Sequence, residues 1–472
     1  MVLGVVHVKS IVVLNFLSFY RMGDAFDLSE FGWDNCMIPT DLKNILSFLP
    51  SYKTLKTLRL PTEYNGRTLY FPHKLTHHGG SVYMPAFEKG ELHMDGGYAR
   101  IYKGRRAKFI PNGPETSGPI HLKRTEPFAE VCIKEVKINV TSREDHSSPQ
   151  TRRQAYKEEI HSILYEAYIH ALLYKVMEHE GFPSVIPKMY DVVAHAGGAI
   201  NTGNPTAVES LWITMEFIHG YTLEKYFQRK LVNLKKNSAA AAANQRVFID
   251  VFIQLSHYLR ILQDKARFNH RDMKINNIYV RHHDTPWSQK LNIPDFGVWA
   301  CDADIVLIDY GFSCIACGEG FPNPRATLLG AGSWFRSEHD CLKYGRDLCQ
   351  FLYSVHCAFP FHEYVSGEFL NVIHNALYAM KGGNLVDLFR GVDSHGLPVT
   401  GNMSQRMLCF NEGIYIFLRE RDVEVPGCRP PVFLKNLLPL VPNILTVELP
   451  STAAPSPPPP AYEEEVLPPP SV

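Results

Sequence analysis

The sequence has no excess of charge of either sign. Its 472 residues include 48 Lys and Arg and 48 Asp and Glu, so the formal net charge is zero. Proteins that bind nucleic acid carry a basic surface that neutralises phosphates, so we expect no nucleic-acid partner. Apolar residues make up 45% of the chain, which is enough for a large core and favours one domain with extensions over three domains.

The sequence also lacks a long uninterrupted apolar run. The apolar N-terminal stretch, residues 1–20, is broken by His7, Lys9 and Asn15. A membrane-spanning helix needs about 20 apolar residues, so we expect no stable membrane span. This stretch is open to three interpretations: a secretory signal without a clear cleavage site, a buried strand, or sequence that precedes a true start at Met22. We predict a cytoplasmic protein, with secretion left open.

The ten cysteines lack the paired spacing of zinc sites. Cys314 and Cys317 form a lone Cys-x-x-Cys pair, which is open to metal or redox use. The prediction is that the thiols are reduced, as in cytosolic proteins.

The most informative segment of the chain is residues 270–280, with the sequence HRDMKINNIYV. This spacing resembles the catalytic loop of protein kinases, which implies that Asp272 accepts the proton of an attacking hydroxyl and that Lys274 meets the charge of a transferred phosphoryl group. Asn277 follows the aspartate at the distance from which it can turn back to a magnesium ion. The apolar run Ile278–Val280 predicts a short strand directly after these groups.

A second segment, residues 304–312, is an apolar β-branched run that ends in Asp-Tyr-Gly. Asp309 is the predicted magnesium ligand, because a carboxylate after a buried strand can bridge phosphate oxygens through the metal. Asp295 lies in a competing Asp-Phe-Gly tripeptide. Pro294 precedes it and cannot donate to a strand ladder, so we favour Asp309. Residues 282–303 are then an insertion between two strands.

A third segment, residues 131–134, places Lys134 at the end of an apolar strand pattern. A buried lysine needs a partner, because burying an unpaired charge is costly. Glu166 is the best candidate, since apolar residues surround it at helical spacing. Glu158, Glu159 and Glu178 remain rivals.

In this order, the motifs resemble those of the protein kinase superfamily of serine/threonine type, over roughly residues 88–390. The residues of these motifs also resemble those of kinase-like proteins of large DNA viruses, which would place the chain in the host cytoplasm or the virion. The resemblance implies an α+β, two-lobed protein-kinase fold with a β-rich N-lobe, a mostly α-helical C-lobe and a disordered C-terminal tail. The implied domains are an N-terminal extension at 1–87, a kinase-like domain at 88–440 and a proline-rich tail at 441–472. Within the kinase-like domain, the N-lobe covers about 88–217 and the C-lobe about 218–440. Inserts are expected near 105–127, 235–245 and 282–303.

The resemblance also implies ATP and Mg²⁺ as cofactors. Residues 94–101 resemble the glycine-rich loop over the phosphates, although Met94 and Ala99 stand where the family has glycine. Residues 211–223 resemble the segment that binds adenine, and Asp347 would brace the backbone of the catalytic loop. The implied nucleotide site consists of Gly96, Gly97, Ala99, Ile101, Cys132, Lys134, Met215, Glu216 and Ile218, with Asn277 and Asp309 as metal ligands and Asp272, Lys274, Lys134 and Glu166 as catalytic residues.

The sequence departs from the family after Asp309. No Ala-Pro-Glu motif is visible, and Glu338 is a candidate substitute for its glutamate. Lys274 favours a serine/threonine protein kinase, whereas the missing motif weakens the case for a protein substrate. Arg271 is placed to bind a phosphorylated Thr327 or Ser333 through charge-assisted hydrogen bonds.

The last residues, 455–472, consist mostly of Pro, Ala, Ser and Glu and predict a disordered tail. Within this tail Pro459, Pro460 and Tyr462 form a PPxY sequence, which resembles ligands of WW-type domains. The alternative is a tail that serves solubility alone.

Three functions stay open. The favoured one is a serine/threonine protein kinase that acts on a protein substrate. The alternatives are a small-molecule kinase of the same fold, and a pseudokinase scaffold that recruits WW-type partners through the tail. The presence of Lys134, Asp272, Asn277 and Asp309 together argues against the scaffold.

Overall fold

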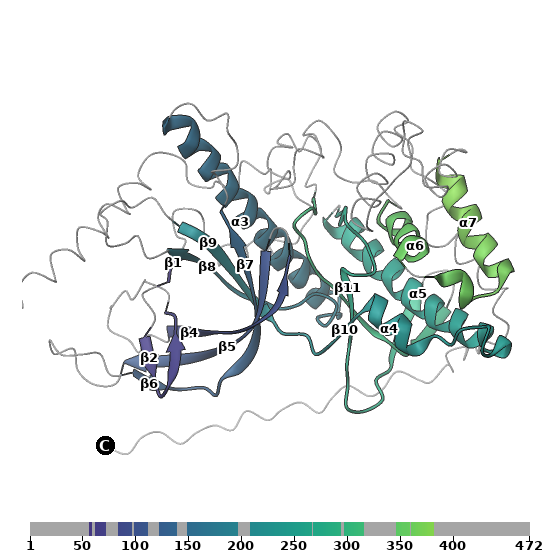
Figure 1. The fold of residues 1–472 in the computed structure, drawn as a ribbon, viewed down its shortest axis with the longest axis horizontal. Coiled ribbons are helices and arrows are strands. Elements are labelled where there is room, and N and C mark those ends of the chain that lie inside the picture. The colour runs from purple at the N-terminus through teal and green to yellow at the C-terminus, as the bar shows by residue number, and fades with distance from the viewer. Residues whose placement is uncertain are drawn as a thin grey trace, which may run out of the picture.

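The computed structural model has helices and strands in comparable amounts, as an α+β protein requires (Figure 1). It describes residues 56–58, 62–71, 84–96, 99–111, 122–138, 149–196, 208–266, 268–293, 297–315, 346–358 and 360–381. Within these residues, no helix is both long enough and apolar enough to cross a membrane.

A seven-stranded sheet forms the first part of the molecule, in the order β1-β8-β9-β7-β5-β4, with β6 paired to β5. β1 runs parallel to β8, and the other neighbours are antiparallel. β2 (Thr62–Tyr64) and β3 (Arg67–Leu69) form a separate hairpin. The strands of the sheet are β1 (Lys56–Thr57), β4 (Met84–Asp95), β5 (Ala99–Pro111), β6 (Leu122–Arg124), β7 (Ala129–Lys137), β8 (Met189–Ala196) and β9 (Val208–Glu216).

This sheet begins earlier in the chain than expected. The predicted boundary between residues 87 and 88 falls inside β4, and β1 belongs to the same sheet. Short strands such as β1 are held by hydrogen bonds to residues far along the chain, so the local sequence does not predict these strands. Part of the predicted insert at 105–127 is also strand, because β5 continues to Pro111 and β6 pairs with it.

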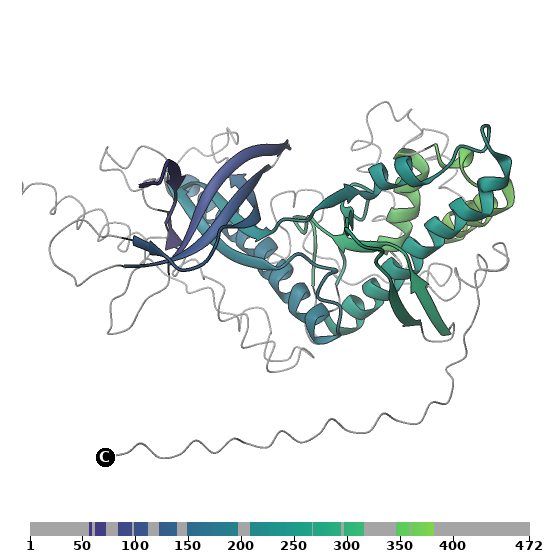
Figure 2. The same cartoon turned by 90° about the horizontal axis from the view of Figure 1, so that it is seen from below.

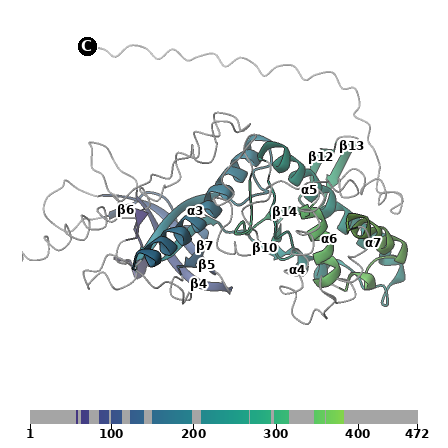
Figure 3. The same cartoon turned by 90° about the horizontal axis from the view of Figure 1, so that it is seen from above.

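Helix α3 (Pro149–His179) covers one face of the sheet (Figure 3). Its buried residues recur every three to four positions, which aligns them along one side of the helix. They pack against alternate residues of β8 and β9. The cluster contains Ile160, Ile163, Leu164, Ala167 and Tyr168 of α3 with Val192, Ala194, Leu211 and Ile213 of the sheet.

The helices α4 to α7 gather at the opposite end of the molecule from the sheet (Figures 1 and 2). Their shared core is rich in phenylalanine, with Phe248 at its centre against Phe361 and Phe369. The predicted insert near 235–245 contains η4 and the first turn of α5, because its alanines favour helix. The elements are α4 (Leu223–Lys230), η4 (Ser238–Ala240), α5 (Ala241–Ala266), α6 (Arg346–Ala358), η6 (Phe361–Glu363) and α7 (Gly367–Lys381).

A small sheet of β10 (Gly220–Thr222), β11 (Ile278–Arg281) and β14 (Asp304–Leu307) belongs to the helical end. β11 and β14 are the strands predicted on either side of the insertion at 282–303, and they pair directly. The insertion itself contains a hairpin of β12 (Gln289–Ile293) and β13 (Gly297–Cys301). Asp250 of α5 anchors this hairpin by accepting hydrogen bonds from Trp299 Nε1 at 2.9 Å and from the Asp302 amide at 3.0 Å.

Candidate functional site

The segment that follows Asn269 is held from α6 by a buried carboxylate. Asp347 accepts hydrogen bonds from the backbone amides of His270 at 2.8 Å and Arg271 at 2.9 Å. It also accepts one from Asn269 Nδ2 at 3.2 Å. The contact predicted for Asp347 is therefore present, and it fixes the backbone from which Asp272 projects.

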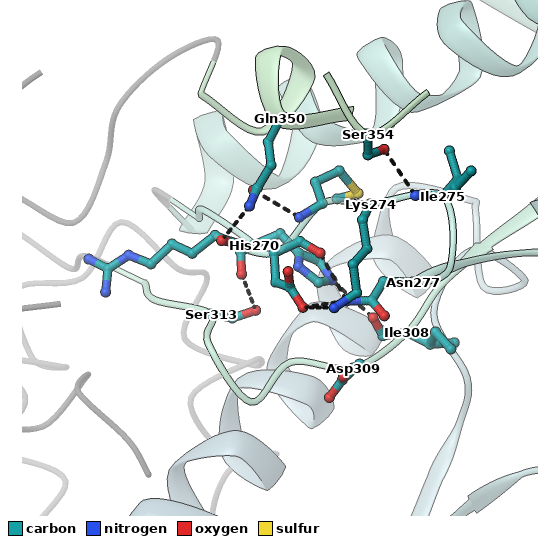
Figure 4. A network of polar contacts seen from close by, with 12 residues as sticks. His270, Lys274, Ile275, Asn277, Ile308, Asp309, Ser313, Gln350 and Ser354 are labelled. Atoms are coloured by element: carbon teal, nitrogen blue, oxygen red, sulfur yellow. Dashed lines mark hydrogen bonds and ion pairs between the residues drawn. The ribbon is translucent and has the colours of Figure 1, made fainter. Parts of the chain in front are cut away.

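Two further residues of α6 hold the same segment, and the sequence analysis missed both. Gln350 accepts from the Met273 amide at 2.9 Å, and Ser354 Oγ accepts from the Ile275 amide at 3.1 Å (Figure 4). Both side chains are fully buried. With Asp347 they form a polar stripe on one face of an otherwise apolar helix, and that spacing was a signal that could have identified them.

Asp272, Lys274 and Asn277 form one cluster, as their spacing predicts. Lys274 Nζ lies 2.7 Å from Asp272 Oδ2, and Asn277 Nδ2 donates to the same oxygen at 2.9 Å. Burial raises the pKa of Asp272, while the charge of Lys274 opposes the rise. A carboxylate with a raised pKa is a better proton acceptor than an exposed one.

Lys134 contacts two carboxylates at once. Its Nζ forms an ion pair with Glu166 Oε1 of α3 and lies 2.9 Å from Asp309 Oδ1. Burial alone would lower the pKa of Lys134, but the charges of Asp309 and Glu166 raise it overall. The charge of Lys134 in turn lowers the pKa of Asp309 to about 2. The structure therefore brings the sheet, α3 and the end of β14 together at a single ammonium group.

The structure separates Glu166 from the rival that it describes. Glu178 is bonded to Lys175 Nζ at 2.6 Å and to the Tyr174 hydroxyl at 3.0 Å, and it does not contact Lys134. The side chains of Glu158 and Glu159 lie outside the described residues.

Asp309 follows β14 directly, and its neighbours are fixed on both sides. The Ile308 amide donates to the Asn277 carbonyl at 3.0 Å, which brings the two predicted metal ligands to adjacent segments (Figure 4). The Tyr310 hydroxyl donates to the Leu307 carbonyl at 2.6 Å, which explains how a tyrosine is buried at this position.

Asp295 lies outside the described residues. The strands on either side of it, β12 and β13, pair with each other, and Ile293 lies opposite Gly297. This hairpin is a sheet separate from the one that contains β11 and β14.

The predicted glycine-rich loop lies where β4 and β5 meet. The Gly96 amide donates to the Ala99 carbonyl at 3.0 Å. Ile101 pairs across the sheet with Lys134, so the start of β5 lies next to the lysine. Gly97 lies outside the described residues.

The residues predicted around adenine follow β7 and β9. Cys132 pairs with Met215 in the sheet and lies two residues before Lys134, so both project from the same face of β7. Glu216 ends β9, and Ile218 lies in the link to β10. Within the described residues, the amide and carbonyl of Ile218 have no backbone hydrogen-bond partner.

Cys314 departs from the prediction of reduced thiols, because it takes part in a disulfide. Its backbone amide donates to the Asn269 carbonyl at 2.9 Å, directly before the segment at 270–280. Cys132 and Cys301 are unpaired thiols. The other predictions for the region after residue 315, at Cys317, Thr327, Ser333 and Glu338 and in the tail at 441–472, lie outside the described residues.

A scan against protein-family models and a search of curated proteins found no match to this sequence. Within the part of the chain that the structure describes, no group of three or more His, Cys, Asp and Glu side chains is placed to hold a metal ion.

Proposed function

We propose that this chain is an ATP-dependent phosphotransferase with a protein-kinase fold, and that it transfers the γ-phosphoryl group of Mg-ATP to serine or threonine hydroxyls of proteins. The observation that carries the proposal is the pairing of Lys134 with both Glu166 and Asp309. A lysine on a strand, a glutamate on the helix that covers the sheet and an aspartate after a second strand are the arrangement by which kinases hold ATP phosphates and metal.

The proposed fold divides the chain at the link after β9. The sheet and α3 correspond to the N-lobe at about 88–217, extended by the strands that precede residue 88. The helices α4 to α7, with β10, β11 and β14, correspond to the C-lobe. The separation of the sheet from the helices in Figures 1 and 2 supports this assignment.

The described side chains fit a magnesium ion bound by few protein ligands. Asn277 uses its Nδ2 for Asp272, and Asp309 uses its Oδ1 for Lys134. Among the described contacts, Asn277 Oδ1 and Asp309 Oδ2 remain available as oxygen ligands. Mg²⁺ prefers oxygen ligands and is commonly held by one or two side chains together with substrate phosphates, so a larger cluster is not required.

Each residue then has a separate role. Lys134 binds the α and β phosphates and is held in position by Glu166. Asp272 orients the acceptor hydroxyl and takes its proton, and Lys274 neutralises charge on the transferred group. When bound, Mg²⁺ neutralises the phosphate charge. The turn at Gly96 covers the phosphates, with Gly97, Ala99 and Ile101 beside it.

The base would lie near Cys132 and Met215, with backbone groups of Glu216 and Ile218 at its edge. Ile218 supports this role, because among the described residues its backbone groups have no backbone partner and a purine edge supplies a donor and an acceptor.

A protein acceptor is favoured by Lys274, which contacts Asp272 at 2.7 Å. Small-molecule kinases of the same fold are the alternative. A scaffold is a weaker candidate, because Lys134 contacts Asp309 and Asp272 contacts Asn277. We further propose that Pro459, Pro460 and Tyr462 recruit a WW-type domain and that the protein acts in the cytoplasm.

Incubation of the full-length chain with radiolabelled ATP, Mg²⁺ and a mixture of proteins tests the proposal. Transfer to protein that is lost in Lys134→Met and kept in Lys137→Met is the expected result. Lys137 is the matched control, because it is an exposed lysine on the same strand. Transfer to small alcohols alone would favour the alternative, and no transfer or ATP binding by the wild type would refute the proposal.

A further inference from the structure

Arg281, at the end of β11, joins three separate segments of the chain. Its Nη1 lies 2.6 Å from Glu216 Oε1, and its Nη2 donates to the Ser184 carbonyl at 3.2 Å. Its Nε lies 3.4 Å from Asp304 Oδ2. The Arg281 side chain is 17% exposed and that of Asp304 is 4% exposed, so water screens these contacts weakly.

Glu216 is also held from its other side. Its Oε2 accepts from the Lys188 amide at 3.2 Å, and its own amide donates to the Lys188 carbonyl at 2.8 Å. The carboxylate therefore connects the segment before β8 with the end of β11, and these contacts hold its side chain in one position.

The link between β9 and β10 is attached to the end of β11 at both ends. Arg281 holds it at Glu216, and the His282 amide donates to the His219 carbonyl at 2.7 Å. At Gly220 the two strands are too close for any other residue, since an added Cβ would lie 2.2 Å from the Val280 carbonyl oxygen. Ile218, whose backbone groups have no backbone partner among the described residues, lies between these two attachments.

We infer that Arg281 is a positioning residue that sets residues 216–219 for the edge of a nucleotide base. This inference rests on the proposed function and deepens it, because it assigns nucleotide affinity to a residue outside the phosphate and metal groups. None of the described contacts of Arg281 reaches Lys134, Asp272 or Asp309. Loss of the Arg281–Glu216 contact therefore weakens base binding and leaves the chemical step intact.

The variants must avoid leaving Asp304 buried without a cation. Asp304 also contacts His283 Nε2 at 2.8 Å, but Arg281 is the permanently charged group beside it. Arg281→Lys keeps the positive charge but removes the guanidinium group that contacts Glu216 and Ser184 at the same time. Glu216→Gln keeps the shape of the side chain and removes its charge. Arg229→Lys is the control, because Arg229 contacts Tyr221 of the neighbouring β10 and does not contact Glu216.

The experiment measures ATP and ADP affinity by titration of the full chain, together with KM for ATP, kcat and the melting temperature. Each of Arg281→Lys and Glu216→Gln is expected to weaken nucleotide affinity and raise KM by about tenfold, with kcat within about twofold of the wild type. The double variant is expected to lose no more than either single variant, because both act through one contact. The control is expected to bind like the wild type.

Two outcomes overturn the inference in distinguishable ways. A wild type that binds no ATP refutes the proposed function together with the inference. A wild type that binds ATP, with variants of equal affinity or with additive losses in the double variant, refutes the inference alone. A fall in kcat and melting temperature without a change in KM would show a purely structural contact and refute it as well.

Discussion

Replacement of Lys134 by methionine removes the cation that Glu166 and Asp309 share. Removal of one partner of a buried ion pair costs about 3–5 kcal/mol. The Asp309 side chain is 42% exposed, so water offsets part of this cost, and we expect the free energy of unfolding to fall by about 2–3 kcal/mol at pH 7. The same variant should lose phosphoryl transfer.

The loss of stability should depend on pH in a defined direction. In the wild type, Lys134 lowers the pKa of Asp309 to about 2. This contribution is present above the ordinary aspartate pKa and is lost as the pH falls towards about 2. In the variant, burial and the neighbouring carboxylate favour protonation of Glu166 and Asp309, so the penalty is present at neutral pH and disappears as these groups take up protons. The difference between wild type and variant should therefore shrink between pH 7 and about pH 4.5.

Denaturant titration of wild type, Lys134→Met and Lys137→Met at both pH values measures this difference. Lys137→Met should match the wild type at each pH, since Lys137 is exposed at the end of β7. A loss in Lys134→Met that is the same at both pH values would refute the electrostatic argument and leave a packing defect as the explanation.

Four further predictions concern the proposed reaction and the tail. Asp272→Asn should keep ATP binding and lower phosphoryl transfer by about 10²–10⁴-fold, and near-normal turnover in a kinetic assay would exclude the proposed base. Asp309→Ala should abolish magnesium-dependent turnover while Asp295→Ala keeps most of it, and the reverse result in paired assays would reassign the metal ligand. Phosphoamino-acid analysis should find phosphoserine or phosphothreonine, and phosphotyrosine alone would contradict the proposed acceptor. Deletion of residues 451–472, and likewise Tyr462→Ala, should remove binding to WW-type domains while the melting temperature and phosphoryl transfer stay unchanged. A titration in which the intact chain does not bind a WW-type domain would refute the docking role.

The contacts within residues 270–280 were predictable because they are local. Asp272, Lys274 and Asn277 lie within one loop, and the strand after them follows from a short apolar run. The pairing of Lys134 with Glu166 was also predictable, although the two residues are far apart in sequence. A lysine in an apolar strand requires a carboxylate, and the helical apolar pattern around Glu166 indicates which one faces the sheet.

The parts that sequence reasoning missed depend on distant contacts. The partners of Arg281 lie 65 residues away at Glu216 and 97 residues away at Ser184, and no motif marks them. The same holds for β1, a strand of two residues that exists through its pairing with β8. The hairpin in the insertion at 282–303 is held by the buried Asp250, which accepts a hydrogen bond from Trp299 49 residues away.

Two residues at the proposed site have a left-handed backbone conformation that non-glycine residues rarely adopt. Among the described residues other than glycine, Asn65, Arg271 and Asp309 have a positive φ, at 48°, 65° and 66°. Asn65 lies in the turn between β2 and β3, where such a conformation is common, whereas the other two lie at the proposed site.

A residue held in the left-handed region costs about 1–3 kcal/mol and persists where surrounding contacts over-determine it. Arg271 is held by Asp347 at its amide and by Gln350 at its carbonyl, and Asp309 by the ion pair with Lys134. Burial alone does not require two strained residues on adjacent segments of one site. Such residues cluster at active sites, and Arg271 precedes the proposed base while Asp309 is the proposed metal ligand, so the strain supports the proposed phosphoryl transfer.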